Sequence, residues 1–524
     1  RLKGFRAMHS ARQRRFERTR VATAAALLPV VLACATPAFA QDGVAAGGAR
    51  AYAIVPSVGL RQTLTDNVRL TSTNREAAAV TEATPGVRAT RYGGRFNGFL
   101  DYALTGRVQT NGSPQDDVSQ ALNAFANAEL IDQWMFVDVR GVIAQQAISA
   151  FGTQSLDSSV SNPNRTETRS FSVSPYWVGS LAGAADYEVR LDHSATDTSS
   201  GAASDAATTT ALARIGGGNP LGFGWSADGT HVTSDYTAGR RTKDQRLRGI
   251  LTYAVTPQFN AGVIVGHEEN NYESVEMRGH ETGGVQFNWR PSERTTLTGN
   301  YESRFFGHSH ALSFVHRTGR TIWTFTDSRN ISTNASQAGT AALGSAYDLF
   351  FQQFASQEPD PIKRDLLVRQ FLQTNGIAPN AVIVGGFLSS AATVQRLQAL
   401  SVGLRGVRTT ITFHLTQSSS GRLDNIVTAV DDLSNSSQVR QRGLHVDVSH
   451  RLTPLSSISF IVSTQRTQGD LASQESTLNS LSTTWSTRTG PRSTLSAGAR
   501  WVDFDSTTQP YVERALFANL RLQF

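Results

Sequence analysis

A histidine, an aspartate and a serine, the residue types of a hydrolytic triad, occur within one short segment as His445, Asp447 and Ser449. In a triad the histidine takes the serine proton while the carboxylate orients the imidazole, so the side chains must hydrogen-bond to one another. The segment alternates in polarity like a β-strand, and same-face neighbours on a strand lie about 6.5–7 Å apart, too far for that bond. We therefore expect these residues to line a wet interior and not to form a catalytic site.

Other chemical motifs are equally weak. His308 and His310 could bind a metal ion, but two histidines do not complete a site. The sequence contains no H-E-x-x-H motif and no phosphate-binding glycine-rich loop followed by Lys and Ser or Thr. We predict no catalytic residue, no cofactor and no metal, and we do not expect an enzyme.

The elements that carry these residues alternate between an apolar and a polar face. The even positions from 96 to 108 are Phe, Gly, Leu, Tyr, Leu, Gly and Val, whereas the odd positions include Arg95, Asp101 and Arg107. Segments 186–192, 283–290, 408–415 and 444–449 repeat this period of two, which is typical of β-strands. A soluble sandwich and a membrane barrel both have this period, so the period alone does not separate them.

The connections between the strands favour the barrel. Tight turns are predicted around Pro257, Pro291, Pro454 and Pro491, because proline fixes φ and cannot donate a ladder hydrogen bond. Longer connections, such as 267–279, 418–437 and 469–475, lie between them. Short turns on one side and long loops on the other are typical of an outer-membrane barrel. We predict an all-β transmembrane antiparallel β-barrel over 51–524, with about 22 strands and a range of 18–24.

The C-terminal strand has the same two faces. Leu516, Ala518, Leu520, Leu522 and Phe524 share one face, and Asn519, Arg521 and Gln523 share the other. A terminal aromatic residue on an apolar face resembles the signal that the bacterial outer-membrane assembly machinery recognises. An ordinary amphipathic strand that ends in Phe is the alternative interpretation.

The first forty residues have the pattern of a secretory signal peptide. Eight basic residues and one acidic residue precede an uncharged stretch that closes with Ala38-Phe39-Ala40, which predicts cleavage after Ala40 and a short linker over 41–50. Lipidation of Cys34 is an open alternative. The whole chain holds 49 basic and 42 acidic residues, so residues 41–524 hold 41 of each, and no nucleic-acid partner is expected. The predicted location is the outer membrane of a Gram-negative bacterium, with its lipid and assembly machinery as partners.

One region, 330–395, loses the alternation. Asp360 and Pro361 suit a helix N-terminus, and Arg364, Asp365 and Arg369 follow within the same predicted helix. Strand parity places this partly helical insertion on the extracellular side. A connection of this length is commonly functional or folded inward, so we expect a gating, plugging or docking element. A surface helical hairpin without a gating role is the alternative.

The start of the predicted barrel carries a more specific similarity. Residues 55–60 (VPSVGL), 63–70 (TLTDNVRL), 82–87 (EATPGV) and Asp101-Tyr102, together with Glu358-Pro-Asp360-Pro361 in mid-chain, resemble the PEP-CTERM system-associated outer-membrane proteins. This resemblance implies an association with exosortase and exopolysaccharide gene systems, and it assigns no functional residue.

Two functions remain open. The first is a porin-like conduit, with a polysaccharide as the candidate cargo, because about 22 strands enclose a lumen that side chains alone do not fill. The second is a plugged barrel that anchors surface polymer or partner proteins. The oligomeric state is not predicted.

Overall fold

The computed structural model describes residues 52–110, 118–157, 159–199, 205–218, 222–333, 336–337, 386–423 and 431–524, with single positions between 351 and 369. The predicted signal peptide, with Cys34, Ala38 and Ala40, lies outside the described residues, as does the linker 41–50. Signal cleavage therefore stays a prediction. The barrel is described below by itself.

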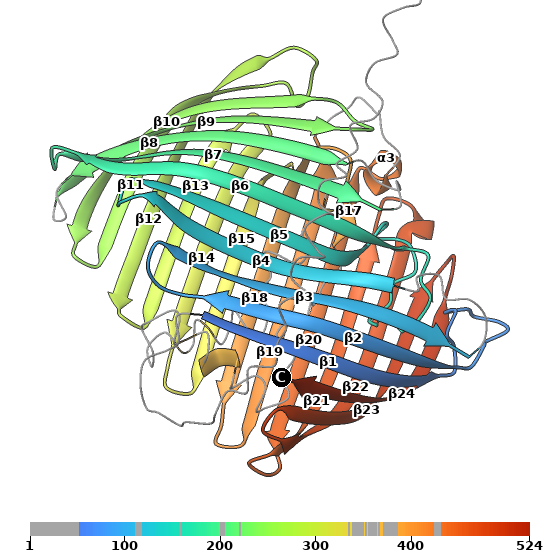
Figure 1. Cartoon of the computed structure of the whole chain (residues 1–524). Helices are drawn as coiled ribbons and strands as arrows, with labels where there is room; N and C mark the ends of the chain where they lie inside the picture. The colour runs from blue at the N-terminus through green and yellow to red at the C-terminus, as the bar shows by residue number, and fades with distance from the viewer. Residues whose placement is uncertain are drawn as a thin grey trace, which may run out of the picture. The chain divides into compact units, whose positions relative to one another are not determined.

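The described strands form one closed antiparallel barrel (Figure 1), as predicted. Two strands, β16 (Ser336–Gln337) and β17 (Phe387–Leu388), have two residues each, and the other 22 form the ring. These 22 are β1 (Tyr52–Thr65), β2 (Ala78–Arg91), β3 (Phe96–Gln109), β4 (Val118–Ile131), β5 (Met135–Ala147), β6 (Arg165–Leu181), β7 (Ala185–Thr198), β8 (Ala206–Gly218), β9 (Phe223–Tyr236), β10 (Thr242–Thr256), β11 (Phe259–Asn270), β12 (Arg278–Ser292), β13 (Thr295–Arg304), β14 (Gly307–Arg317), β15 (Thr321–Ser332), β18 (Thr393–Arg405), β19 (Thr409–Arg422), β20 (Gln438–Arg451), β21 (Ser456–Gln468), β22 (Glu475–Gly490), β23 (Ser493–Ser506) and β24 (Tyr511–Gln523).

The ring closes where β1 pairs with β24, a junction that we call the seam. Nine residue pairs form it, from Ser57↔Gln523 to Thr65↔Ala515. The neighbouring β1–β2 ladder has fourteen pairs. Closure pairs the backbone N–H and C=O groups that the edge strands of an open sheet would expose. A sheet in lipid requires this pairing.

The two ends of the barrel differ in their connections. Turns such as 132–134, 182–184, 257–258 and 491–492 join the strands at the end where β1 begins and β24 finishes. At the other end the connections are mostly longer, for example 66–77, 148–164 and 423–437. The short-turn end is periplasmic by the convention of outer-membrane barrels, and the other end is extracellular. The proline turns and the long loops occur at the predicted places, but β11, β12 and β19 extend into the predicted loops, which are 271–277 and 423–437.

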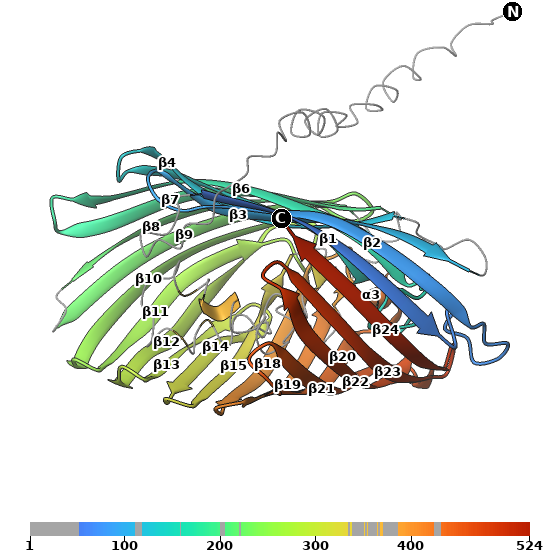
Figure 2. The same ribbon diagram turned by 60° about the horizontal axis from the view of Figure 1, so that its bottom comes forward.

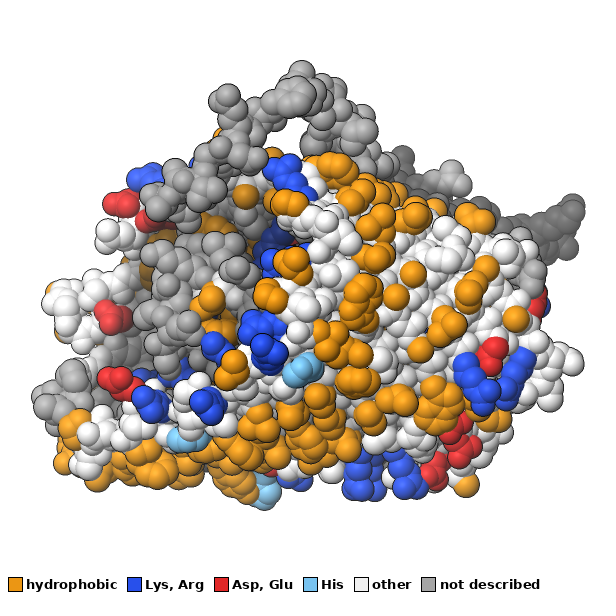
Figure 3. All heavy atoms as spheres, turned by 90° about the horizontal axis from the view of Figure 1, so that it is seen from below, with side chains coloured by type: hydrophobic (Ala, Val, Ile, Leu, Met, Phe, Trp, Pro, Cys, Tyr) orange, Lys and Arg blue, Asp and Glu red, His pale blue; other side chains and the backbone are white. Residues whose placement is uncertain are grey.

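The outer surface of the ring is apolar along its strands (Figure 3). Leu516 and Phe524 of the last strand are 60% and 61% exposed, whereas Glu513 and Ala515 on the opposite face are buried. This places the predicted apolar face of β24, with Ala518, Leu520 and Leu522, outward. Its recognition by the assembly machinery stays a prediction.

Tryptophans gather near the periplasmic turns on the same outer surface. Trp225 and Trp323 are the third residues of β9 and β15, and Trp289 lies near the end of β12. Each is more than 40% exposed. An apolar band with an aromatic girdle is the surface of an outer-membrane barrel, so the protein is an outer-membrane β-barrel. Among the described residues, no helix has both the length and the apolar character needed to cross a membrane.

The insertion predicted over 330–395 joins the extracellular ends of β15 and β18. The two flanking strands extend slightly into the predicted insertion, because Ile331 and Ser332 of β15 pair with Val394 and Thr393 of β18. Most of the insertion lies outside the described residues. Within it, α-helical geometry is described at Phe351, Arg364 and 367–369, so the predicted partly helical insertion is seen only as these short pieces within the described residues.

Candidate functional site

The inner face of the barrel is lined by charged and hydroxyl-bearing side chains. One group of charges, which we call the seam cluster, lies beside the junction of β1 and β24. It consists of Arg61, Glu82, Arg107, Asp157, Arg500 and Glu513. Three cations face three anions, so the group is formally neutral. Pairing of this kind is what makes buried charge tolerable in a protein interior.

Arg500 joins the two halves of this cluster. Its guanidinium lies 2.8 Å from the Glu513 carboxylate on β24 and also forms an ion pair with Asp157. Asp157 bonds in addition to Arg61 on β1, at 2.5 Å. All of these side chains except Arg61 have less than a tenth of their surface exposed. Asp157 belongs to a loop and not to the barrel wall, so the cluster attaches that loop to strands on both sides of the seam.

A second group of charges, the far-wall cluster, lies on β9 to β13. It consists of Asp228, Asp244, Arg248, Glu268, Glu302 and Arg304. Glu268 is fully buried and accepts hydrogen bonds from the Arg304 guanidinium at 2.8 Å and from the Phe305 amide at 2.7 Å. Arg248 bridges Asp228 and Glu302.

Replacing Glu268 by alanine is expected to destabilise the barrel by about 3 kcal/mol, because it removes the nearest anion from a buried Arg304. Arg304 keeps Asn330 at 3.0 Å and Asp244 at 3.8 Å as partners. The expected loss of unfolding free energy therefore lies at the lower end of the range for a broken buried ion pair. Denaturant unfolding in lipid vesicles measures the change. Glu269→Ala is the matched control, since Glu269 is the next residue and points to the other face of β11. Equal losses of unfolding free energy for Glu268→Ala and Glu269→Ala would contradict a stabilising role for the buried ion pair between Glu268 and Arg304.

The extracellular connection between β5 and β6, residues 148–164, folds over the barrel opening, and we call it the mouth loop. Ser158 lies outside its described residues. Asn164 organises the loop: its amide donates to the carbonyls of Ser149 at 2.8 Å and Thr153 at 3.1 Å, and its Oδ1 accepts from the Ser149 amide at 2.9 Å. Asn162 donates to the Thr153 carbonyl and to Ser155. The hydrogen bonds within it make the loop a defined structural unit.

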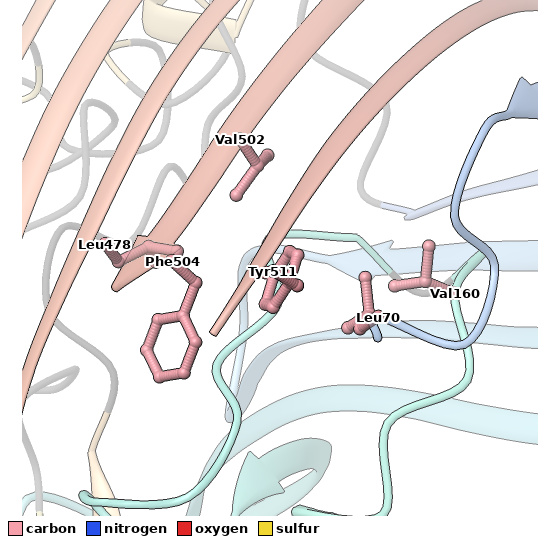
Figure 4. Close-up of a cluster of buried hydrophobic side chains, with 6 residues drawn as sticks. All are labelled: Leu70, Val160, Leu478, Val502, Phe504 and Tyr511. Atoms are coloured by element: carbon pink, nitrogen blue, oxygen red, sulfur yellow. The ribbon is translucent and has the colours of Figure 1, made fainter. Parts of the chain in front are cut away.

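One side of the mouth loop docks on β23, β24 and the first extracellular loop. Val160 packs into an apolar cluster with Leu70, Leu478, Val502, Phe504 and Tyr511 (Figure 4). The Tyr511 hydroxyl donates to the Gln154 carbonyl at 2.6 Å, and the Ser161 amide donates to the Val68 carbonyl at 2.9 Å. Together with the ion pairs of Asp157, these contacts fix the loop beside the seam.

The other side of the mouth loop docks on α3 (Asp432–Asn435), a single turn between β19 and β20. The Asp432 carboxylate accepts hydrogen bonds from the Ser149 hydroxyl and the Ala150 amide, both at 2.6 Å. Ala150 packs with Phe387, Leu433 and Val439. On one path round the ring, β20 is separated from β5 by β21 to β24 and β1 to β4. On the other path, β19 is separated from β6 by β7 to β15 and β18, so the loop spans the extracellular mouth.

The pH dependence of mouth-loop docking follows from the carboxylates of Asp157 and Asp432. Burial on its own would raise the pKa of Asp157, but Arg500 and Arg61 outweigh burial and hold the pKa well below the usual 3.8. Its contribution to docking is therefore complete above pH 3.8 and is lost as the pH falls through the depressed pKa. Burial raises the pKa of Asp432 despite the hydrogen bonds from Ser149 and Ala150, so protonation there favours the docked loop.

We therefore expect the mouth loop to stay docked from about pH 8 to about pH 4.5 and to release only below about pH 3. Planar-bilayer conductance across this range is the measurement. Conductance that rises between about pH 6 and pH 4.5 would show that Asp157 does not hold the loop in the ionised form.

The residues predicted for a gating or docking helix are only partly described. Asp360, Pro361 and Asp365 lie outside the described residues, whereas Arg364 and Arg369 are helical. The Arg364 guanidinium lies 4.7 Å from the centre of the Phe351 ring. Their gating or docking role stays a prediction.

Two apolar side chains of the insertion are buried inside the ring. Phe354 is 2% exposed and lies under the guanidinium of Arg405, which is 4.9 Å from the centre of its ring. Arg405 ends β18 at the periplasmic side and lies on the same, lumen-facing side of the strand as Ser401 and Gly403. Val368 is fully buried. In Figure 2 the helical piece in yellow-orange lies within the ring of strands, so part of this extracellular connection reaches deep into the lumen.

The lumen-facing wall of β18 to β22 is rich in buried hydroxyl groups. It includes Ser401, Thr410, Thr412, Thr416, Ser418, Ser457, Ser459 and Ser480. His445, Asp447 and Ser449 lie on this wall as predicted, and they are buried. The His445 ring lies against that of His414, with 6.0 Å between the ring centres, and His414 bonds to Ser401 at 2.9 Å.

His308 and His310 lie elsewhere, at the start of β14 on the outer surface, where His310 contacts Asp327 at 3.1 Å. Among the described residues, no three or more His, Cys, Asp or Glu side chains form a group that could hold a metal ion.

The mouth loop is the part of the candidate site that the sequence did not reveal. Alternation stops between Ile148 and Asn164, and Asn162-Pro163-Asn164 is a strong turn signal. That signal predicts a loop but not its inward course, because the course depends on Arg500, Tyr511 and Asp432, hundreds of residues away in sequence.

Comparison with solved structures finds outer-membrane proteins. The FrpB iron transporter from Neisseria meningitidis, in its F5-1 apoprotein form, has 9% identity and a TM-score of 0.46 over 90% of this chain and 81% of that chain. The siderophore receptor PirA from Acinetobacter baumannii has 9% identity and a TM-score of 0.44 over 90% and 80%. A BenF-like porin from Pseudomonas fluorescens Pf-5 has 8% identity and a TM-score of 0.34 over 90% and 99%. No family model and no curated protein matches the chain. At these identities the likeness carries no functional argument, and the site is interpreted from its own residues.

Proposed function

We propose that this outer-membrane barrel is a gated conduit for a hydrated polar solute, closed at its extracellular mouth by the mouth loop. The observation that carries the proposal is the docking of that loop on two distant parts of the rim. Asp157 is held by Arg500 and Arg61 on one side, and Ser149 is held by Asp432 on the other. A loop that bridges the opening through a few polar contacts can close it in one state and open it in another.

The chemistry of the lumen supports a polar cargo. Hydroxyl groups line β18 to β22, and paired arginines and carboxylates line the seam and the far wall. Such a lining can exchange hydrogen bonds with a sugar or an ion as it passes. The sequence resemblance described above supports a polysaccharide as the cargo and an exosortase-associated gene system as the setting.

A second candidate, a plugged barrel that anchors surface polymer or partner proteins, is favoured by one observation. Phe354 and Val368 of the insertion are buried, and Phe354 lies against the lumen-facing Arg405 near the periplasmic end. An insertion fixed in the lumen by such contacts would block passage and leave the extracellular loops to bind a partner.

Efflux from lipid vesicles separates the two candidates. The purified protein is inserted into vesicles that contain labelled oligosaccharides of graded length. A conduit releases short chains slowly when the mouth loop is docked and faster when Asp157 and Asp432 are both replaced by alanine. Retention of every sugar by all variants, together with capture of a polysaccharide that depends on 330–395, would favour the anchoring barrel and overturn the conduit.

A further inference from the structure

Arginines concentrate on the outer surface of β18 to β21, at the extracellular end of the strands. Arg396, Arg440, Arg442 and Arg466, which we call the arginine patch, all have outward side chains that are exposed. The register places them side by side: Arg396 pairs with Ser419, Ser419 with Arg440, and Arg442 with Arg466. They belong to the wall of the barrel, not to its loops.

The patch lies at the upper edge of the apolar band. The outward row next to Arg442 and Arg466 on the periplasmic side holds Leu400, Leu415, Leu444 and Thr464, and the following outward row holds Val402, Phe413, Val446 and Val462. Leu415 is 47% exposed and Val462 is 51% exposed, as expected of side chains that face acyl chains. The guanidinium groups therefore lie at the level of the lipid headgroups in the outer leaflet.

The pairing of Arg442 with Arg466 places two like charges directly opposite each other. Like charges in cross-strand pairs are destabilising unless a counter-charge lies between them. Arg466 forms an ion pair with Glu475, and Arg396 has one with Asp327 at 3.1 Å. Arg442 has no ion pair with an acidic side chain among the described residues, and its neighbour on β19 is the uncharged Gln417. The excess positive charge is centred on Arg442.

Arg440 adds a second cation above this pair. Its Nε donates to Gln438 at 2.7 Å, and it interacts electrostatically with Asp470 in the next extracellular loop. Its cross-strand partner on β21 is Gln468, so no acidic side chain is opposite it in the ladder. Arg440 lies one outward row above Arg442 and Arg466, and all three side chains are exposed.

We propose that Arg440, Arg442 and Arg466 bind the phosphate groups of a phosphorylated glycolipid in the outer leaflet of the membrane. A phosphate between the guanidinium groups of Arg442 and Arg466 removes their repulsion and accepts bidentate hydrogen bonds. The acyl chains of the same lipid then lie along Leu444, Val446 and Val462. Lipid is the occupant that the geometry favours, because the apolar rows begin directly below the cations. A lipid contacts both the cations and the apolar rows, whereas a free anion contacts only the cations.

Native mass spectrometry of the delipidated barrel in detergent tests this assignment. The probes are a diphosphorylated glycolipid, the same glycolipid without its phosphates, and inorganic phosphate. We expect the barrel to bind the diphosphorylated lipid at least about tenfold more tightly than the dephosphorylated lipid, because charge-assisted hydrogen bonds are lost with the phosphates. Arg442→Gln combined with Arg466→Gln is expected to remove this preference.

The matched control carries the same change of charge at the other end of the same strands. Arg408→Gln combined with Arg451→Gln removes two charges beside the periplasmic ends of β19 and β20, and it is expected to keep the tenfold preference. Equal binding of the two lipids by the unmodified barrel would overturn the proposal. Equal loss in both double variants, or full competition by inorganic phosphate at the lipid's concentration, would also overturn it. Both variants keep the lumen-facing residues, so a folded barrel with unchanged conductance confirms that any loss of lipid arises at the outer surface.

Discussion

Asp157→Ala is expected to release one side of the mouth loop and to raise the open fraction of the barrel about a hundredfold. The substitution removes ion pairs with Arg500 and Arg61, each of a kind that contributes about 1.5–3 kcal/mol. Arg500 remains paired with Glu513, so the barrel wall keeps its own ion pair. The main loss is therefore in docking of the loop and not in folding of the barrel. Single-channel conductance measures the open fraction.

A spin label in the mouth loop and a control variant show whether the change in conductance comes from release of the loop. A spin label attached at Leu156→Cys, which replaces a half-exposed side chain of the loop, should become mobile in the same variant. Residues 41–524 contain no other cysteine, so the label is specific. Asp503→Ala is the control, because it removes an acidic side chain from the outer face of β23 and leaves Arg500 untouched. Unchanged conductance with a released loop would mean that the loop does not close the pore, and an immobile label would mean that Asp157 does not hold the loop.

Removing residues 338–386, with β16 and β17 joined by a short Gly-Ser linker, is expected to raise conductance about tenfold or more. The ring of 22 strands encloses a space wider than its own side chains can fill, and Phe354 shows that the insertion enters that space. Burial of Phe354 and Val368 stabilises the insertion by about 1.5–3 kcal/mol each. The strand ladders do not depend on these contacts, so the shortened barrel should still fold.

The control for this deletion is a chain in which 338–386 is replaced by a Gly-Ser segment of equal length. It keeps the length of the insertion but has no apolar side chains to dock, so it should conduct like the deletion. If neither chain conducts more than the unmodified barrel, the insertion does not obstruct the lumen. Comparison with Asp157→Ala then assigns closure to the mouth loop, to the insertion or to both.

The wall of this barrel is predictable because its chemistry is local. Each strand carries its own alternation, so the outward face of Leu516 to Phe524 follows from the sequence alone. Turn residues such as Pro257 and Pro454 mark the periplasmic end for the same reason. The number of strands and their antiparallel order then follow from counting.

The contents of the lumen are not predictable in this way. Glu268 and Arg304, or Asp157 and Arg500, are ordinary polar positions in their own segments, and only the closed ring brings them together. The insertion shows the same limit, because helical spacing around Arg364 indicates a helix without saying where it packs. An inward loop and an outward loop have similar compositions, and contacts distant in sequence decide between them.

The mouth loop also has a consequence for the order of assembly. The seam joins strands from opposite ends of the chain through nine pairs, and closing so long a segment has a larger entropic cost than pairing neighbouring strands. Asp157 contacts Arg61 on one edge of that junction and Arg500 beside the other edge, so the loop works as a clamp across it. It can take this position only when both edges have met. The closed mouth is therefore a property of the completed ring, and an unfinished barrel, which lacks the second edge, remains open until its first and last strands pair.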